Sequence, residues 1–294
     1  MNASIFKTVT FTSVALLAFA GNSVLCRLAL GDAVIDAASF TAIRLLSGIV
    51  VLMALLLVTK NDKKPVSKGS WFAAILLFVY AITFSFAYIS LDTGTGALIL
   101  FGSVQLTMII TSLALGHKLH YSEWLGVLIA FLGFFYLVKP SLSTPSFTGF
   151  VLMVMSGIAW GGYTLKGRGS INPISDTRYN FLRTLPFVFL LIILSLQDIH
   201  LSSSGVILAI LSGAIASGIG YAIWYIALRG LTVIQASVVQ LLVPIIAALG
   251  GILLVNEMIT LRLALSTLMV LGGILIVIIG RYYFTQLSND KNKV

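Results

Sequence analysis

The sequence predicts an all-α integral membrane protein, with ten transmembrane helices in two inverted five-helix repeats. Two properties point to a membrane. The mean hydropathy is +1.08, and charged residues make up 9% of the chain, against about a quarter in average proteins. A third property points to the repeats, because short sequences of the first half recur in the same order in the second. A soluble chain of 294 residues could not cover its surface with so few charges.

Ten apolar stretches have the length of a membrane span, which takes about 20 apolar residues in a helix. The first begins like a secretory signal peptide, with Lys7 and a small-residue stretch from Ala18 to Gly21. Its apolar run continues to Leu30, so we expect a membrane helix there. The loops between stretches are too short for a soluble domain. The predicted spans are residues 8–30, 36–59, 70–91, 95–116, 121–139, 147–166, 178–197, 204–228, 232–255 and 260–284.

The basic residues predict the orientation of these spans. The net charge is +9, but the basic residues are scattered between apolar stretches, which argues against a nucleic-acid partner. With a cytoplasmic N-terminus, thirteen of the eighteen lie in the cytoplasm, three lie outside (Arg27, Lys139 and Arg262), and Arg44 and Arg183 lie within spans. Basic residues favour cytoplasmic loops. We therefore expect a multi-pass protein of the plasma membrane, the inner membrane in a bacterium, with both termini cytoplasmic and the lipid bilayer around it.

The internal repeat predicts how the two halves are related. "FAGNSVLCR" from Phe19 aligns with "WGGYTLKGR" from Trp160, and "FTAIRLL" from Phe40 aligns with "YNFLRTL" from Tyr179. The predicted repeats are residues 1–141 and 142–294, with the register of the fourth span on the ninth left open. Five helices per repeat is an odd number, so the second repeat enters the membrane from the opposite side. Inverted repeats are typical of secondary transporters, with a solute site near the bilayer midplane.

Arg44 is a full charge inside an apolar span. It lies eight residues after Asp36, roughly 12 Å along a helix, where a charge is costly and usually faces protein or water. Such an arginine can contact an anionic group of a solute, or it can be structural and bond neighbouring helices. Arg183 lies only five residues after Arg178, so its side chain can reach the membrane interface.

Three sequence features resemble one transporter family. They are the arginine in the second and seventh spans, "GTGALILFGSVQLTM" from Gly94, and "QLLVPIIAALGGILLVNEMIT" from Gln240. The chain is similar to EamA-like ten-helix members of the drug/metabolite transporter superfamily. The resemblance implies export of amino acids or other small metabolites, a path lined by spans 1, 3, 4, 6, 8 and 9, and structural roles for Arg44 and Arg183. Carriage of lipid-linked or sugar-linked cargo and a non-transporting role as a membrane assembly subunit stay open.

Aromatic residues at helical spacing and amides within spans are the candidate solute-binding residues. A small-molecule site is mostly apolar with a few polar groups, and an amide in lipid needs a partner. Packing between helices is the alternative role for the aromatic residues. Pro186 and Pro244 interrupt spans, and we expect a hinge at Pro244. The candidates are Asn22, Tyr80, Phe84, Gln105, Trp160, Tyr163, Tyr221, Trp224 and Gln240.

The sequence argues against an enzyme and against a cofactor. Cys26 is the single cysteine, and His117, His120 and His200 lie in predicted loops with no third ligand, so we expect no metal. We see no nucleophile or carboxylate pair within a span. The expected partner is a small-molecule solute, and the sequence leaves monomer and homodimer open.

Overall fold

The described part of the chain is helical throughout. The computed structural model describes residues 3–58, 67–114, 116, 121–138, 145–167, 170, 172–228, 230–231, 236 and 239–291. Within them the only β-type pairing outside helices is an isolated antiparallel bridge between Ile35 and Leu201. The helices of the first half are α1 (Ala3–Leu30), α2 (Ala37–Val58), α3 (Trp71–Tyr88), α4 (Thr93–Ala114) and α5 (Tyr121–Val138).

The second half contains more helical segments because two of its predicted spans are divided. Its segments are α6 (Phe147–Gly167), α7 (Pro173–Leu182), α8 (Leu185–Leu194), α9 (Ser203–Ile210), the π-helix η1 (Leu211–Ile219), α10 (Gly220–Leu228), α12 (Leu242–Val255) and α13 (Leu261–Lys291).

Eight helical stretches are long and apolar enough to cross a membrane, so the protein is a multi-pass membrane protein. Two shorter apolar helices, Glu123–Leu137 and Leu242–Val255, lie at the fifth and ninth predicted spans. The total of ten spans stays a prediction. The eight stretches are Phe6–Leu30, Ala37–Leu55, Trp71–Tyr88, Thr93–Thr111, Phe147–Gly167, Ile174–Leu194, Ser203–Leu228 and Leu261–Gly280.

The seventh predicted span starts earlier than expected and is broken. We predicted a start at residue 178, but α7 begins at Pro173, where the Asn172 side chain caps it by accepting a hydrogen bond from the backbone N–H of Ser175. Proline at the start of a helix loses no hydrogen bond. The interruption near Pro186 is confirmed, because α7 ends before Arg183 and Pro186 lies in the first turn of α8.

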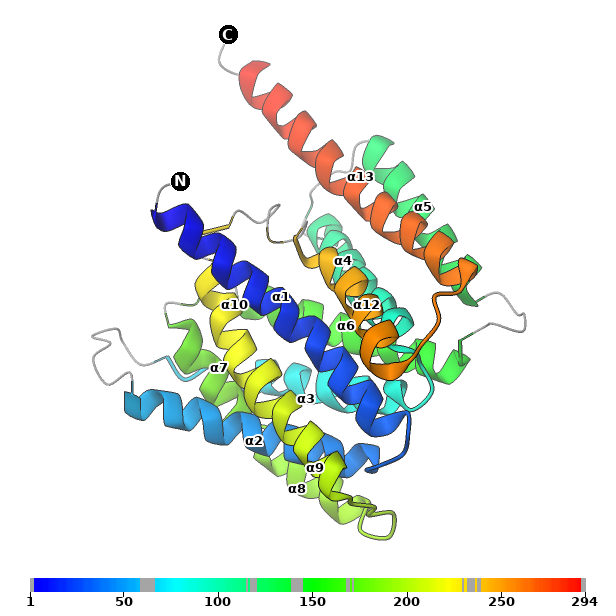
Figure 1. Ribbon diagram of the computed structural model, residues 1–294. Coiled ribbons are helices and arrows are strands. Elements are labelled where there is room, and N and C mark those ends of the chain that lie inside the picture. The colour runs from blue at the N-terminus through cyan, green and yellow to red at the C-terminus, as the bar shows by residue number, and fades with distance from the viewer. Residues whose placement is uncertain are drawn as a thin grey trace.

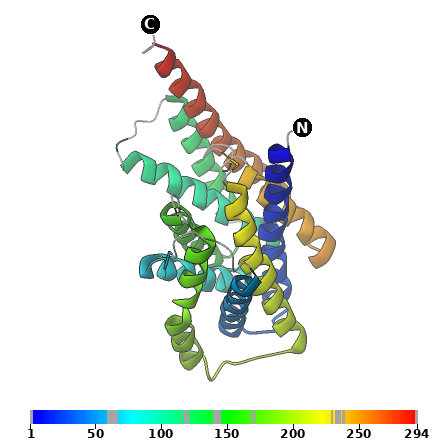
Figure 2. The ribbon, with the colours of Figure 1, turned by 90° about the vertical axis from the view of Figure 1, so that its left-hand side faces the viewer.

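The helices pack as one bundle with a two-helix flank. Helix α1 packs against α10 and α12, α3 and α4 pack against α6, and α2 packs against η1. Helices α5 and α13 pack side by side at the edge of the bundle (Figures 1 and 2). The α4–α6 contact is close, because a Cβ at Gly157 would lie 2.5 Å from the Cβ of Ser103. Small residues such as this glycine let two membrane helices approach closely.

Candidate functional site

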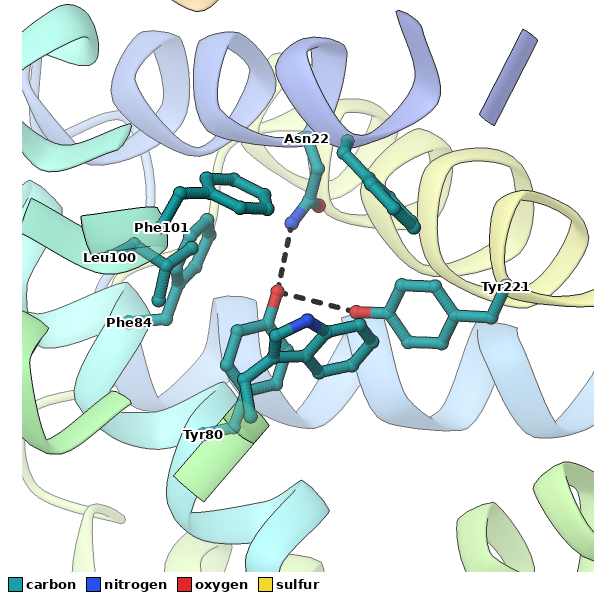
Figure 3. A pocket seen from close by; sticks show the side chains of 8 residues that line it. Asn22, Tyr80, Phe84, Leu100, Phe101 and Tyr221 are labelled. Carbon is teal, nitrogen blue, oxygen red and sulfur yellow. Dashed lines mark hydrogen bonds between the residues drawn. The ribbon is translucent and has the colours of Figure 1, made fainter. Parts of the chain in front are cut away.

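A small cavity lies at the centre of the bundle, between helices of both halves. Its volume is about 10 Å³, room for about one water molecule. Five helices supply its walls: α1, α3 and α4 from the first half, and α6 and α10 from the second. The lining residues are Phe19, Asn22, Tyr80, Phe84, Leu100, Phe101, Trp160 and Tyr221, most of them labelled in Figure 3.

Aromatic rings form most of the wall, with Trp160 in the middle. The Trp160 ring centre lies 4.8 Å from that of Tyr80 and 4.7 Å from that of Tyr221. Phe19 meets Trp160 edge-on at 6.2 Å. Such contacts hold rings in fixed orientations beyond simple burial. The cavity is therefore a preformed apolar space with flat walls.

The polar groups of the cavity meet at the hydroxyl of Tyr80. It accepts hydrogen bonds from Asn22 Nδ2 at 3.4 Å and from the Tyr221 hydroxyl at 3.2 Å, both drawn in Figure 3. It also accepts one from Arg44 Nη2 at 3.0 Å. Donors from α1, α2 and α10 thus meet at one oxygen atom.

The π-helix η1 aligns two serines with this network. The Ser212 hydroxyl donates to Asn22 Oδ1 at 2.6 Å, and the Ser217 hydroxyl accepts from Arg44 Nε at 3.3 Å. A π-helix forms its hydrogen bonds from i to i+5 and has more residues per turn than an α-helix, so two serines five positions apart lie toward one face. In an α-helix, at 3.6 residues per turn, the same two would be roughly 140° apart.

Arg44 is buried beside the cavity and has no acidic partner among the described residues. Its side chain is 1% exposed. The guanidinium carbon lies 5.2 Å from the ring centre of Tyr80 and 4.8 Å from that of Phe84, both of which line the cavity. Its Nη1 is buried and makes no hydrogen bond within the described residues. Among the residues that the structure describes, hydroxyl groups and ring faces are therefore the partners of this positive charge.

The structure brings five of the nine predicted binding residues to the cavity: Asn22, Tyr80, Phe84, Trp160 and Tyr221.

The other four predicted residues are buried but do not line it. Trp224 lies behind the wall, 5.6 Å from the Phe19 ring, and Tyr163 stacks on Trp160 at 5.5 Å. Gln240 donates to the backbone oxygen of Ala236 in its own segment at 3.2 Å, and Gln105 is buried in α4.

Three lining residues were not predicted: Phe19, Leu100 and Phe101. Two of them had a local signal that could have been used. Phe19 precedes Asn22 by three positions and Phe101 precedes Gln105 by four, so each shares a helix face with a predicted residue. Leu100 had no such signal, because nothing in the sequence around it distinguishes it from the other leucines of the apolar helices.

Arg183 and Pro244 lie away from the cavity. Arg183 donates to the backbone oxygen of Lys68 and lies over the rings of Trp71 and Tyr179. Pro244 lies in the first turn of α12, directly after a turn at Leu241. The structural role of Arg183 and the hinge at Pro244 remain predictions.

A second polar cluster joins three segments at one end of α1, and we call it the Arg27–Glu257 cluster. Glu257 accepts from Arg27 Nε at 3.1 Å, from the Thr93 backbone N–H at 2.9 and 3.0 Å, and from the Thr93 hydroxyl at 3.1 Å. Arg27 also pairs with Asp92 at 3.5 Å. The cluster links the end of α1, the start of α4 and the segment after α12.

The left-handed cap of α12 positions Glu257. Asn256 has φ 57°, and the N–H of Glu257 donates to the Gly251 carbonyl at 3.1 Å. Asparagine tolerates this conformation at a helix C-terminus. The chain thus turns back, and the Glu257 carboxylate lies against Gly251 rather than in lipid.

The described residues hold no group of three or more His, Cys, Asp or Glu side chains that could bind a metal ion. His117 and His120 lie outside the described residues. The absence of a metal and of a cofactor stays a prediction.

Comparison with known proteins identifies the family. The model of the EamA-like transporter family matches residues 6–139 and again residues 147–279. The chain belongs to this family. The two matches, one in each half, show that it contains two EamA repeats, as the recurring sequences indicated.

Relatives of this EamA-like transporter extend over most of the chain. An uncharacterised protein of Pseudomonas aeruginosa is 49% identical over 275 residues, which cover 94% of this chain and 96% of the relative. An uncharacterised transporter of Archaeoglobus fulgidus is 30% identical over 207 residues, 68% of this chain and 73% of its own length. One solved crystal structure has a TM-score of 0.62 at 17% identity, covering 90% of this chain and 95% of that one, which shows the shared fold.

Proposed function

We propose that this protein exports small organic metabolites, such as amino acids, across the plasma membrane by alternating access. The observation that carries the proposal is the position of the cavity between the two family-matched halves, with walls from α1, α3 and α4 on one side and α6 and α10 on the other. A site shared by two repeats can be exposed to either side when the repeats rock against each other.

The packing of the helices supports two halves that exchange roles. Helix α1 packs against α10 as α6 packs against α3, and α1 packs against α12 as α6 packs against α4. In the two repeats α1 corresponds to α6, α3 to α10, and α4 to α12. Exchanging the halves therefore turns the α1–α10 contact into the α6–α3 contact, and the α1–α12 contact into the α6–α4 contact. The contacts α5–α13 and α4–α12 each join a helix of the first repeat to the corresponding helix of the second. This pattern is expected of two repeats around one pseudo-twofold axis.

The closed state of the cavity fits one step of such a cycle. About 10 Å³ holds a water molecule but no amino acid. With both termini cytoplasmic, the Arg27–Glu257 cluster lies at the outer end of α1 and keeps that side shut. Both ends of the described chain, Ala3 and Lys291, lie toward the same end of the molecule in Figure 1, which agrees with that orientation.

Efflux tests this function. Cells with and without the protein are loaded with amino acids and related metabolites, and their release is followed. The purified protein is then placed in proteoliposomes with each solute that passes, and protein-free liposomes serve as the control. We expect solute flux that requires only this chain. Flux of lipid-linked or sugar-linked cargo alone would favour the rival carrier, and no flux without a second protein would favour an assembly subunit.

A further inference from the structure

We propose that Arg44 binds the carboxylate, or a similar anionic group, of the transported solute. This inference rests on the transport function proposed above, and it names the chemical class of the solute. It takes the first of the two roles that the sequence leaves open for this arginine, in place of the purely structural one.

The first argument is the uncompensated charge. An arginine side chain stays protonated in proteins and offers five N–H donors. A buried ion without a counter-ion is costly. Within the described residues, both ion pairs involve Arg27, and Arg44 has hydroxyl partners only, with Nη1 unbonded. A charge in this state gains more from an anion than from a neutral ligand.

The second argument is the excess of donors at the Tyr80 oxygen. A hydroxyl oxygen has two lone pairs, yet Asn22, Arg44 and Tyr221 all direct a donor at this one. Two full hydrogen bonds saturate it, so one of the three donors is poorly satisfied. A carboxylate has about four acceptor positions on two oxygens, and it would satisfy all three donors together with the free Nη1 of Arg44.

The Tyr80 hydroxyl therefore occupies the place of the solute's anionic oxygen in the closed state. When the cavity opens, Tyr80 moves aside, and the anion takes over the bonds to Asn22 and Arg44. Ser212 fixes this geometry, because its bond to Asn22 Oδ1 leaves the Nδ2 donor facing the cavity. The apolar part of the solute then lies among the rings of Phe19 and Trp160.

Ligand-dependent thermal stabilisation of the full-length protein in lipid nanodiscs tests the inference. The probes are amino acids and aliphatic and aromatic monocarboxylic acids, each compared with its own primary amide. We expect at least one acid to bind the wild-type protein at least tenfold more tightly than its amide. That ratio should fall toward one in Arg44→Gln and stay intermediate in Arg44→Lys, which keeps the charge. Arg183→Gln, a neutralised arginine away from the cavity, should keep the wild-type ratio.

A second variant covers the case in which Arg44→Gln does not fold. Tyr80→Phe removes the hydroxyl that stands in for the anion and leaves Arg44 in place, so an acid should stabilise it at least as strongly as the wild type. The inference is overturned if no acid is preferred over its amide, or if the preference survives in Arg44→Gln. Flux of neutral solutes with no acid preference would keep the proposed function and reject this inference. Acid binding without flux would keep this inference and reject the proposed function.

Discussion

Glu257 and Thr93 are 164 positions apart in the sequence and are joined by three hydrogen bonds to one carboxylate. The backbone N–H of Thr93 contacts both carboxylate oxygens, and its hydroxyl contacts one. The same carboxylate pairs with Arg27. One acidic side chain thus ties the start of α4 to the ends of α1 and α12.

Glu257→Gln should therefore destabilise the protein far more than Asp92→Asn. The Glu257 side chain is 14% exposed and carries both an ion pair and the Thr93 bonds, whereas the Asp92 side chain is 59% exposed with a single 3.5 Å contact. We expect a loss of about 1.5–3 kcal/mol for Glu257→Gln, typical of hydrogen bonds to a charged group, and below about 1 kcal/mol for Asp92→Asn. Thermal unfolding in detergent measures both, and equal losses would contradict the geometry.

Gly213→Ala should separate α2 from the π-helix. A Cβ at Gly213 would overlap the backbone oxygen of Arg44 and the hydroxyl of Ser47. The Ser47 hydroxyl can rotate away, but the backbone oxygen of Arg44 cannot move without α2, so we expect a loss of about 1–3 kcal/mol, the usual cost of overpacking. Gly272→Ala is the matched control, since nothing lies within 4 Å of its Cβ position. A Gly213→Ala protein as heat-stable as the control would show that the contact is loose.

Trp160→Phe should weaken solute binding more than Trp224→Phe. Both tryptophans are buried, but only Trp160 lines the cavity. We expect about a tenfold loss of affinity for Trp160→Phe, near 1.4 kcal/mol, for the solute identified in the efflux screen. Trp224→Phe should lower the melting temperature without this loss. Equal affinities in the two variants would remove Trp160 from the binding site.

Transport should run without an imposed pH gradient. Proton-driven carriers usually keep a titratable group at mid-membrane. Each acidic side chain that the structure describes lies in a turn, at a helix start or in a first turn: Asp32, Asp36, Asp92, Glu123, Asp176, Asp198 and Glu257. We expect downhill solute flux in proteoliposomes at equal pH on both sides. A fixed number of protons per solute that disappears in Glu257→Gln would contradict this.

Cysteine labelling should show both termini in the cytoplasm. In a Cys26→Ala background, a cysteine at Gln197, exposed in the loop before α9, should react with an impermeant thiol reagent added to intact cells. A cysteine at Lys64, in the basic stretch between the second and third predicted spans, should react only after lysis. The opposite pattern would reverse the topology.

The sequence predicts those parts of the fold and site that depend on local pattern. The length of the apolar stretches predicts most of the spans. The helical spacing of Tyr80 and Phe84 predicts that both side chains lie on the same face of α3, where they line the cavity. The parts it misses depend on contacts between distant segments. No local rule distinguishes the π-helix from an α-helix in an apolar run, and the aromatic pattern does not say that Trp224 packs behind Phe19 and outside the cavity.

The π-helix also sets how this chain can change length. A π-turn holds more residues than an α-turn, so η1 is a place where one residue can be lost while the flanking helices α9 and α10 keep their faces. Deleting Ile215, which is 52% exposed, would shorten the segment toward an α-helix and leave Tyr221 facing inward. Ser212 and Ser217 would then be four positions apart, and residues four apart share a face of an α-helix. The bonds of the two serines to Asn22 and Arg44 can therefore survive the loss of one residue, and homologues that are one residue shorter here should keep the same cavity.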